Sequence, residues 1–357
     1  MNNSKNYAAK GFPWSIGTGT NVKDCTTSQE VIEKARLDFD VQKCELVAKM
    51  PFNINGNNNI DDDSNDFAYK GNIFRECPNA YATYRTDTNI PLGIVKDQYH
   101  VIQNKDAFNF FDEAIGEGKA EWQFAGYLGF GERIFITAKI PFKSDIYGDK
   151  VDNYLVFSNS HDGSMSINIM FTPIRVACTN MLNAALKQAD SYIRIRHTKT
   201  AKERLEQGAR ILRIACEYAE SSQELYKSLA CINMKEENIK NYIASVILKD
   251  DYNKIIASGF PYAIDKLFDR DYITMEKFGI SMVKCNTINK ILDYYKNGIG
   301  QEEIKGTAWG AYNAITGYYC NVHNMDGERR MNSLLYGNYQ TLTNNALNLA
   351  LDYKQAM

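Results

Sequence analysis

The sequence carries no large excess of charge of either sign. Its 41 lysine and arginine residues face 43 acidic residues, which gives a formal net charge of -2 over 357 residues. A balanced charge provides no general attraction to nucleic acid or to an anionic membrane surface. Any binding of nucleic acid must therefore come from a local cluster of basic residues.

Motifs that bind metal ions or stabilise secreted proteins are also missing. None of the eight cysteines forms a C-x-x-C pair, and the four histidines form no H-x-x-x-H or H-E-x-x-H motif. We therefore expect no metal site and no cofactor. The scattered cysteines, several of them on apolar helix faces, indicate a reducing cytoplasm rather than a disulfide scaffold.

No apolar run reaches the roughly 18 residues of a membrane helix, and the N-terminus shows no signal-type apolar core, so we expect a cytoplasmic protein without a membrane partner.

The composition is that of a globular protein. Apolar residues make up 44% of the chain and charged residues 24%, which suffices for a sizeable core. A chain of 357 residues forms one large domain or two ordinary ones. The sequence shows no internal repeat and no low-complexity tract.

The most strongly patterned stretch runs from residue 120 to residue 204. Four runs in it alternate apolar and polar residues and are separated by turn residues. They are Glu121–Leu128, Arg133–Ile140, Val151–Phe157 and Met165–Phe171. Asp162-Gly163 between two such runs is a strong hairpin signal, and short connections force antiparallel neighbours. In the fourth run Ser164, Ser166 and Asn168 share a polar face, which is typical of a half-buried strand.

These patterns predict an α+β fold, with an antiparallel β-meander packed against helices. Beyond Arg204 the apolar residues recur mostly at helical spacing. We therefore divide the chain into an α+β domain, residues 1–220, and a mostly helical region packed on it, residues 221–357. Upstream, Ala80–Arg85 and Ile90–Lys96 are predicted to form a pair of strands, and Asn53–Asp66 a long surface loop.

A basic cluster follows the meander. It comprises Arg194, Arg196, His197, Lys199, Lys202 and Arg204. In a strand beginning at Tyr192, successive side chains alternate between faces. Ile193 and Ile195 would then face one side, while Tyr192, Arg194 and Arg196 share the other.

Cations together with a stacking ring are what a groove for single-stranded nucleic acid requires. Arginine and lysine neutralise phosphates, and a base can stack on Tyr192. Arg175, just upstream, could support the same groove. The alternative is a solvated face whose charges pair with Glu203 and Glu206.

Motifs spread over nearly the whole chain carry a family resemblance. They are Pro13-Trp14 with Gly17, Tyr84-Arg85-Thr86-Asp87, Leu92-Gly93-Ile94-Val95, Tyr99-His100-Val101-Ile102-Gln103-Asn104, Asn159-Ser160-His161-Asp162-Gly163-Ser164, Thr172-Pro173-Ile174-Arg175-Val176-Ala177-Cys178-Thr179-Asn180, Arg196-His197-Thr198, Gly306-Thr307-Ala308-Trp309 and Tyr312-Asn313-Ala314. In these motifs the chain resembles the phage- and plasmid-borne family named domain of unknown function 932. The run Trp14-Ser15-Ile16-Gly17 departs from a commoner Trp-His-Gly-Leu-Gly form, and the missing histidine puts a metal role of that segment in doubt.

The resemblance implies an origin on a mobile element such as a phage, and action in a bacterial cytoplasm. The family has no settled activity to carry over. A strand meander followed by a helix is also similar to the core of the phage single-strand-annealing recombinases of the RecT and Erf type, at the level of fold.

The expected function is therefore that of a phage-encoded protein that binds single-stranded DNA. Acting as a homo-oligomer, it would promote strand annealing in recombination or replication, and no residue is assigned a catalytic role. One alternative is an enzyme of unknown reaction with a polar pocket near the third hairpin. Its residues would be His161, Asp162, Arg175, Cys178 and Asn180. Another alternative is a non-catalytic binder of a host defence protein.

Overall fold

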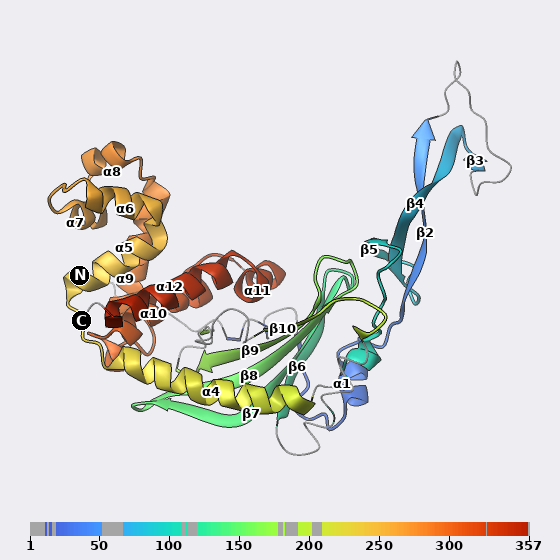
Figure 1. Ribbon diagram of the computed structural model, residues 1–357, viewed down its shortest axis with the longest axis horizontal. Helices are drawn as coiled ribbons and strands as arrows, with labels where there is room; N and C mark the ends of the chain where they lie inside the picture. Colours follow the sequence, from blue (N-terminus) through green and yellow to red (C-terminus); the bar gives the residue numbers. More distant parts are fainter. Residues whose placement is uncertain are drawn as a thin grey trace, which may run out of the picture.

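The fold was analysed in a computed structural model. It describes residues 11–12, 14–15, 19–51, 67–108, 112, 120–177, 181–182, 192–201, 209–325 and 327–355. Residues 1–220 hold the strands, whereas helices predominate beyond residue 209 (Figure 1). This is the α+β arrangement predicted by the sequence.

The strands form two antiparallel sheets. They are β1 (Gly19–Asn21), β2 (Val41–Pro51), β3 (Phe67–Tyr69), β4 (Asn72–Arg85), β5 (Pro91–Lys96), β6 (Glu121–Leu128), β7 (Arg133–Ile146), β8 (Asp149–Ser160), β9 (Ile167–Arg175) and β10 (Tyr192–Ile195). Sheet A has the strand order β1-β6-β7-β8-β9-β10, and sheet B contains β2, β4, β3 and β5. The predicted meander is β6 to β9, whose neighbours pair antiparallel in sequence order.

The helices lie mostly in the C-terminal half. They are α1 (Ser28–Lys34), α4 (Ala209–Ala230), α5 (Glu236–Leu248), α6 (Asp250–Ala257), α7 (Ala263–Phe268), α8 (Tyr272–Phe278), α9 (Met282–Asn297), α10 (Ala308–Gly317), α11 (Gly327–Tyr336) and α12 (Asn338–Gln355), with a short 3-10 turn at Glu302–Ile304 and a π-helical turn at Tyr318–Val322. The first of them, α1, is capped at its N-terminus, because the side chain of Thr27 accepts a hydrogen bond from the backbone of Glu30.

Strand β9 is buried on both faces of sheet A, which corrects the expectation of a half-buried fourth strand. All residues of β9 are buried, including Asn168 on the face predicted to be solvated. One face, with Phe135, Val156 and Met170, belongs to the core formed with the C-terminal helices. The alternation was read correctly, but the sequence alone did not reveal that the C-terminal helices cover the second face.

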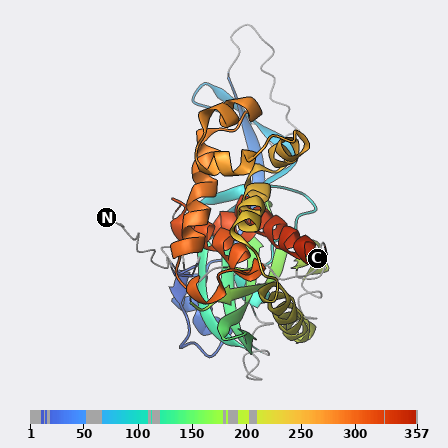
Figure 2. The same ribbon diagram turned by 90° about the vertical axis from the view of Figure 1, so that its left-hand side faces the viewer.

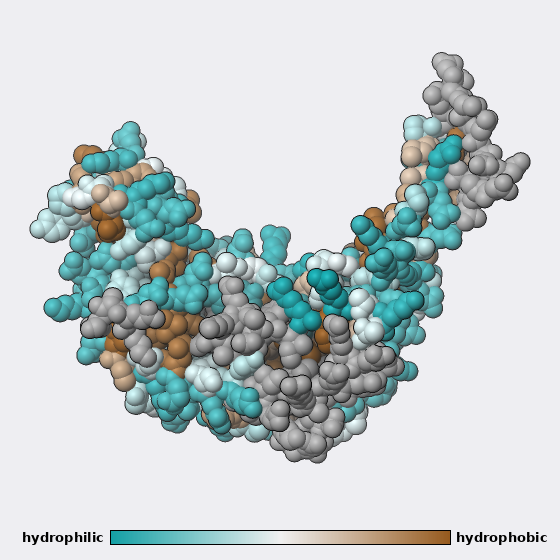
Figure 3. Space-filling view, in the orientation of Figure 1, coloured by the Kyte–Doolittle hydropathy of each residue, from teal (hydrophilic) through white to brown (hydrophobic). Residues whose placement is uncertain are grey.

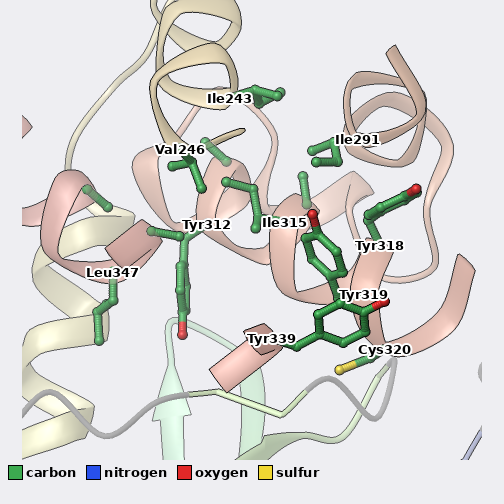
Figure 4. Packing of buried hydrophobic residues seen from close by; sticks show 14 of the residues in the cluster. Ile243, Val246, Ile291, Tyr312, Ile315, Tyr318, Tyr319, Cys320, Tyr339 and Leu347 are labelled. Carbon is green, nitrogen blue, oxygen red and sulfur yellow. The ribbon is translucent and has the colours of Figure 1, made fainter. Parts of the chain in front are cut away.

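The helical core is built mainly from α5, α9, α10 and α12. Figure 4 shows Ile243 and Val246 of α5 next to Tyr312 and Ile315 of α10, all of them buried. Every residue of α10 is buried. Other elements surround this helix, which is mostly apolar around its whole circumference.

Helix α4 connects the two parts of the chain. Ala215 and Ala219 belong to the core on the face of sheet A opposite the helical core, whereas Tyr226 and Leu229 belong to the helical core. The domain boundary expected near residue 220 therefore falls inside a continuous helix. Figure 1 shows this helix running along the sheet toward the helical part.

Sheet B forms an arm that projects from sheet A. Figures 1 and 2 show the arm and the helical lobe of α5 to α8 rising on the same side of the molecule, so that the outline is a crescent. The predicted strand pair Ala80–Arg85 and Ile90–Lys96 forms the base of the arm as β4 and β5. The predicted loop Asn53–Asp66 lies outside the described residues.

The arm is fixed to sheet A at a close backbone contact. The hydroxyl of Thr83 donates to the backbone oxygen of His161 at 2.6 Å. A Cβ atom added to Gly93 would lie 2.5 Å from the Cα of Asp162, so only glycine permits this approach.

Among the described helices, none is long and apolar enough to cross a membrane.

Candidate nucleic-acid interface

Strand β10 forms an outer edge of sheet A and carries the first part of the predicted basic cluster. It pairs antiparallel with β9, with Arg194 opposite Asn168 and Ile195 opposite Ile167. Ile195 is 3% exposed, whereas Arg194 is exposed. The edge thus presents the alternation expected from the sequence, with an aliphatic side chain holding the strand on the core and a guanidinium directed outward.

The basic residues continue beyond the end of β10. Arg196 and Lys199 are both exposed. Tyr192 pairs with Met170 through its backbone, while its side chain lies outside the described part of the structure. Lys202 and Arg204 also lie outside the described residues, so the observed cluster consists of Arg194, Arg196 and Lys199.

His197 is not part of this exposed surface. It is buried and stacks on Tyr99, with ring centroids 4.5 Å apart. Its Nδ1 lies 3.2 Å from the backbone oxygen of His100. Burial lowers the pKa of His197 below its ordinary value, so the ring is neutral at pH 7 and adds no charge that would attract phosphate.

Arg175 also lies away from the edge. It pairs with Val151 at the opposite end of the β8–β9 ladder from Ser158 and Asn168. Its Nε donates to both carboxylate oxygens of Asp149, at 2.8 and 2.6 Å. The indole of Trp309 donates to the same carboxylate at 2.8 Å. The sequence suggested a support for the groove, but Arg175 connects the sheet to α10 within a buried network.

A small polar pocket lies beside Arg194, where the β8–β9 connection and β10 face α11. Its volume is about 290 Å³. The lining residues are Ser164, Met165, Ser166, Asn168, Arg194 and Tyr336. Sequence reasoning identified Ser164, Ser166 and Asn168 as one polar face but took it for solvated surface. The shared polar face could be recognised from the alternation in the sequence, whereas the position of α11 opposite this face could not.

Arg133 contacts Ser164, one of the lining residues, and was missed by the sequence reasoning. Its Nε and Nη2 donate to the hydroxyl oxygen of Ser164 at 3.2 and 3.1 Å, and its Nη1 donates to Oδ1 of Asn332 at 3.0 Å. The carboxylate of Asp162 lies 3.9 Å from its Nε, which is longer than a hydrogen bond. The guanidinium is therefore held in place without a close ion pair to that carboxylate.

Two buried polar atoms lie behind the pocket. Oδ1 of Asn168 and Oγ of Ser158 make no hydrogen bond to any of the described residues. The two residues are cross-strand neighbours, 5% and 2% exposed. A buried polar group without a partner costs about 1–3 kcal/mol, and both atoms are closed off from solvent by the surrounding residues.

Two residues of the pocket expected for an enzyme, His161 and Arg175, do not lie together. His161 is buried, its Nε2 lies 2.9 Å from Oδ1 of Asn104, and it lies at the other end of β8 from Arg175. Cys178 and Asn180 lie outside the described residues. Within the described part of the chain, no group of three or more histidine, cysteine or acidic side chains is arranged to hold a metal ion.

Comparison with known proteins gives one match. Neither the curated proteins nor the solved structures match the chain. The family model described as Domain of unknown function (DUF932) matches residues 91–346. This range includes β6 to β10, the pocket and most of the helical region, while the motifs at Pro13-Trp14 and Tyr84–Asp87 lie outside it. Since the match covers more than half of the sequence, the chain belongs to the family described as Domain of unknown function (DUF932).

Proposed function

We propose that this protein binds single-stranded DNA along the β10 edge of sheet A. As a homo-oligomer it would promote strand annealing in the recombination or replication of a phage or similar mobile element, in a bacterial cytoplasm. The observation that carries the proposal is the edge itself, where Arg194, Arg196 and Lys199 are exposed next to the buried Ile195.

The physical argument rests on charge and position. A chain with a formal net charge of -2 gains no general attraction to DNA, so a local group of cations must supply it. Phosphate contacts need side chains that reach solvent from a rigid support. β10 offers this, because Ile195 is held in the core and pairs with Ile167 of β9.

The shape of the molecule is compatible with a bound strand. Figure 3 shows a hollowed outline between the helical lobe and the arm, with mainly hydrophilic residues along its floor. A hydrophilic concave face with local cations is the kind of surface that follows a nucleic-acid backbone.

A salt titration of single-strand binding tests the proposal. We expect the affinity of the protein for a fluorescent oligothymidine to fall as salt rises from about 50 to 200 mM, with a log–log slope of roughly -0.7 for each phosphate contact. The double variant Arg194→Ala/Arg196→Ala should bind more weakly. Its slope should be shallower by about 1.4, the value for two lost contacts.

A charge-matched control separates the edge from general electrostatics. Lys254 and Lys290 are exposed on α6 and α9 of the helical region, and Lys254→Ala/Lys290→Ala removes the same charge. This control should keep the affinity and slope of the unchanged protein. No binding at low salt, or equal losses in both double variants, would contradict the proposal.

The annealing part of the proposal predicts a change of assembly state. Light scattering should detect a ring or filament, either of the free protein or after addition of the oligonucleotide. A monomer of constant size under both conditions would leave strand binding intact but exclude assembly-driven annealing.

A second candidate function is binding of another protein through the arm. The arm exposes several large apolar side chains, which is uncommon on a solvated hairpin. They are Val47, Met50, Phe67, Tyr69 and Ile94. A host protein recovered from lysate by the full chain, but not by Phe67→Ser/Tyr69→Ser, would support this candidate. Recovery of nucleic acid alone would count against it.

A further inference from the structure

The pocket beside Arg194 combines features that a plain surface depression lacks. It lies where the β8–β9 connection, β10 and α11 meet, and it has a volume of about 290 Å³. Water occupies about 30 Å³ per molecule in the liquid, so the space is large enough for a small charged group together with part of what carries it. Among its lining residues are two serines, one asparagine and one arginine.

The floor of the pocket is polar and nearly buried. Asn168 lines it, is 5% exposed, and its Oδ1 makes no hydrogen bond to the described residues. Buried polar groups in folded proteins nearly always have a partner. Rotation of the terminal amide exchanges its oxygen and its NH2 group, so Asn168 can offer either an acceptor or two donors to a ligand.

Hydrogen-bond donors dominate the rim. The hydroxyl oxygen of Ser164 accepts from Nε and Nη2 of Arg133, so its proton is available to donate. Ser166 adds a second hydroxyl, and Arg194 contributes a guanidinium from β10. One acidic group, Asp162, also lies at this rim: its Oδ1 accepts from the backbone of Ser164 at 2.8 Å, and its Oδ2 lies 3.9 Å from Nε of Arg133.

We propose that this pocket binds the phosphate of a phosphomonoester, with Arg133, Arg194, Ser164, Ser166 and Asn168 as its ligands. A phosphate has more acceptor oxygens than a carboxylate and can use hydroxyl, amide and guanidinium donors together. Two guanidinium groups match its double charge. The phosphate comes either from a free nucleotide or from the 5′ end of a DNA strand on the β10 edge, and the second source rests on the function proposed above.

The position of the pocket favours the end of a strand. Arg194 lines the pocket and is also the first cation of the β10 edge. A strand whose 5′ phosphate enters the pocket would continue past Arg196 and Lys199. The protein would then distinguish processed, phosphorylated ends from other single strands.

Titration calorimetry with the full-length protein tests the site with four probes: a 5′-phosphorylated oligothymidine, the same oligothymidine with a 5′ hydroxyl, thymidine monophosphate and inorganic phosphate. For a strand end, we expect the 5′ phosphate to strengthen binding at least about tenfold, the gain expected from charge-assisted hydrogen bonds. For a free nucleotide, thymidine monophosphate should bind and the two oligonucleotides should not differ. Inorganic phosphate should compete in both cases.

Two variants and one control complete the experiment. Arg133→Gln removes one cation, and Ser166→Asp places a carboxylate in the pocket, so both should abolish the phosphate-dependent gain. Arg270→Gln, an exposed arginine of the helical region, should retain it. Circular dichroism confirms that each variant is folded. The 5′-hydroxyl strand reports separately on the edge, because its binding does not need the pocket.

The outcomes separate the two proposals. Equal binding of both oligonucleotides with no binding of thymidine monophosphate would overturn the proposed phosphate site and leave the proposed binding of single strands at the edge intact. Binding of thymidine monophosphate alone supports the pocket and overturns the edge. A phosphate-dependent gain that survives both Arg133→Gln and Ser166→Asp places the phosphate elsewhere and also overturns the pocket.

Discussion

His161, at the end of β8, shows how burial changes the charge of a single residue. None of its side chain is exposed. Burial, with a smaller contribution from the nearby His197, lowers its pKa from 6.5 to about 3. The side chain therefore remains neutral across the physiological range, which suits a structural hydrogen bond to Asn104 better than proton transfer near pH 7.

This lowered pKa predicts a specific dependence of stability on pH. Between pH 6.5 and pH 3 the unfolded chain binds a proton that folded His161 does not. Stability from this residue is therefore fully present above pH 6.5 and is lost as pH falls, by at most about 1.4 kcal/mol per pH unit. Urea unfolding of His161→Gln should show a shallower loss between pH 6.5 and 4.5 than the unchanged protein. Parallel curves for the two proteins would contradict this assignment.

Arg175 provides a second prediction at the scale of one residue. Removing one partner of a buried ion pair costs about 3–5 kcal/mol because the other charge remains buried. Arg175→Met should therefore lower the free energy of unfolding by that amount, since Asp149 would lose its guanidinium partner and keep the indole of Trp309. Single-strand affinity at 25 °C should not change while the variant is folded. A loss of affinity without a loss of stability would contradict this prediction and show that Arg175 contributes to binding.

Strand β10 acts as an element because its aliphatic face holds its basic face in place. Ile195 lies in the core with Ile167 and Ile169. Replacing it with lysine would bury a charge, which the fold avoids by releasing the strand. The cations of the edge would then lose their common support.

Two variants with the same added charge test this coupling. Ile195→Lys should weaken single-strand binding although it adds a positive charge. Thr198→Lys adds the same charge at an exposed position and should steepen the salt slope by roughly 0.7. Fluorescence anisotropy across a salt series measures both. If Ile195→Lys bound as tightly as Thr198→Lys, charge alone would explain binding and the strand would not matter.

At the scale of the whole molecule, the arm buries far fewer of its side chains than the body does. Along β2 and β4, few side chains are buried, and Ile73 is the main one near the tip. The body contains two large cores, one on each face of sheet A. The outer part of the arm therefore depends on the body for its position, whereas the body does not depend on the outer part of the arm.

Removal of the outer arm should therefore leave the body folded. Residues 46–80 can be replaced by a two-residue Asn-Gly turn, because Glu45 and Tyr81 are cross-strand partners. The shortened protein should keep its melting temperature within a few degrees and its affinity for single strands, since an exposed hairpin contributes little buried area. A large loss of affinity would show that the arm itself contacts the DNA.

The sequence by itself determined the local architecture of this protein. Alternation and the Asp162-Gly163 turn defined the meander, helical periodicity defined the C-terminal region, and the alternation of Ile193 to Arg196 defined the basic edge. These features depend on neighbours within a few positions, so they can be read from the chain.

The tertiary structure decided which polar residues reach solvent. Arg175, His197 and Asn168 are buried because the C-terminal helices and the base of the arm cover sheet A. The phosphate pocket depends on contacts such as that between Arg133 and Asn332, which lie 199 residues apart. Long-range packing of this kind is set by the complementary shapes of whole elements, and no local pattern in the sequence records it.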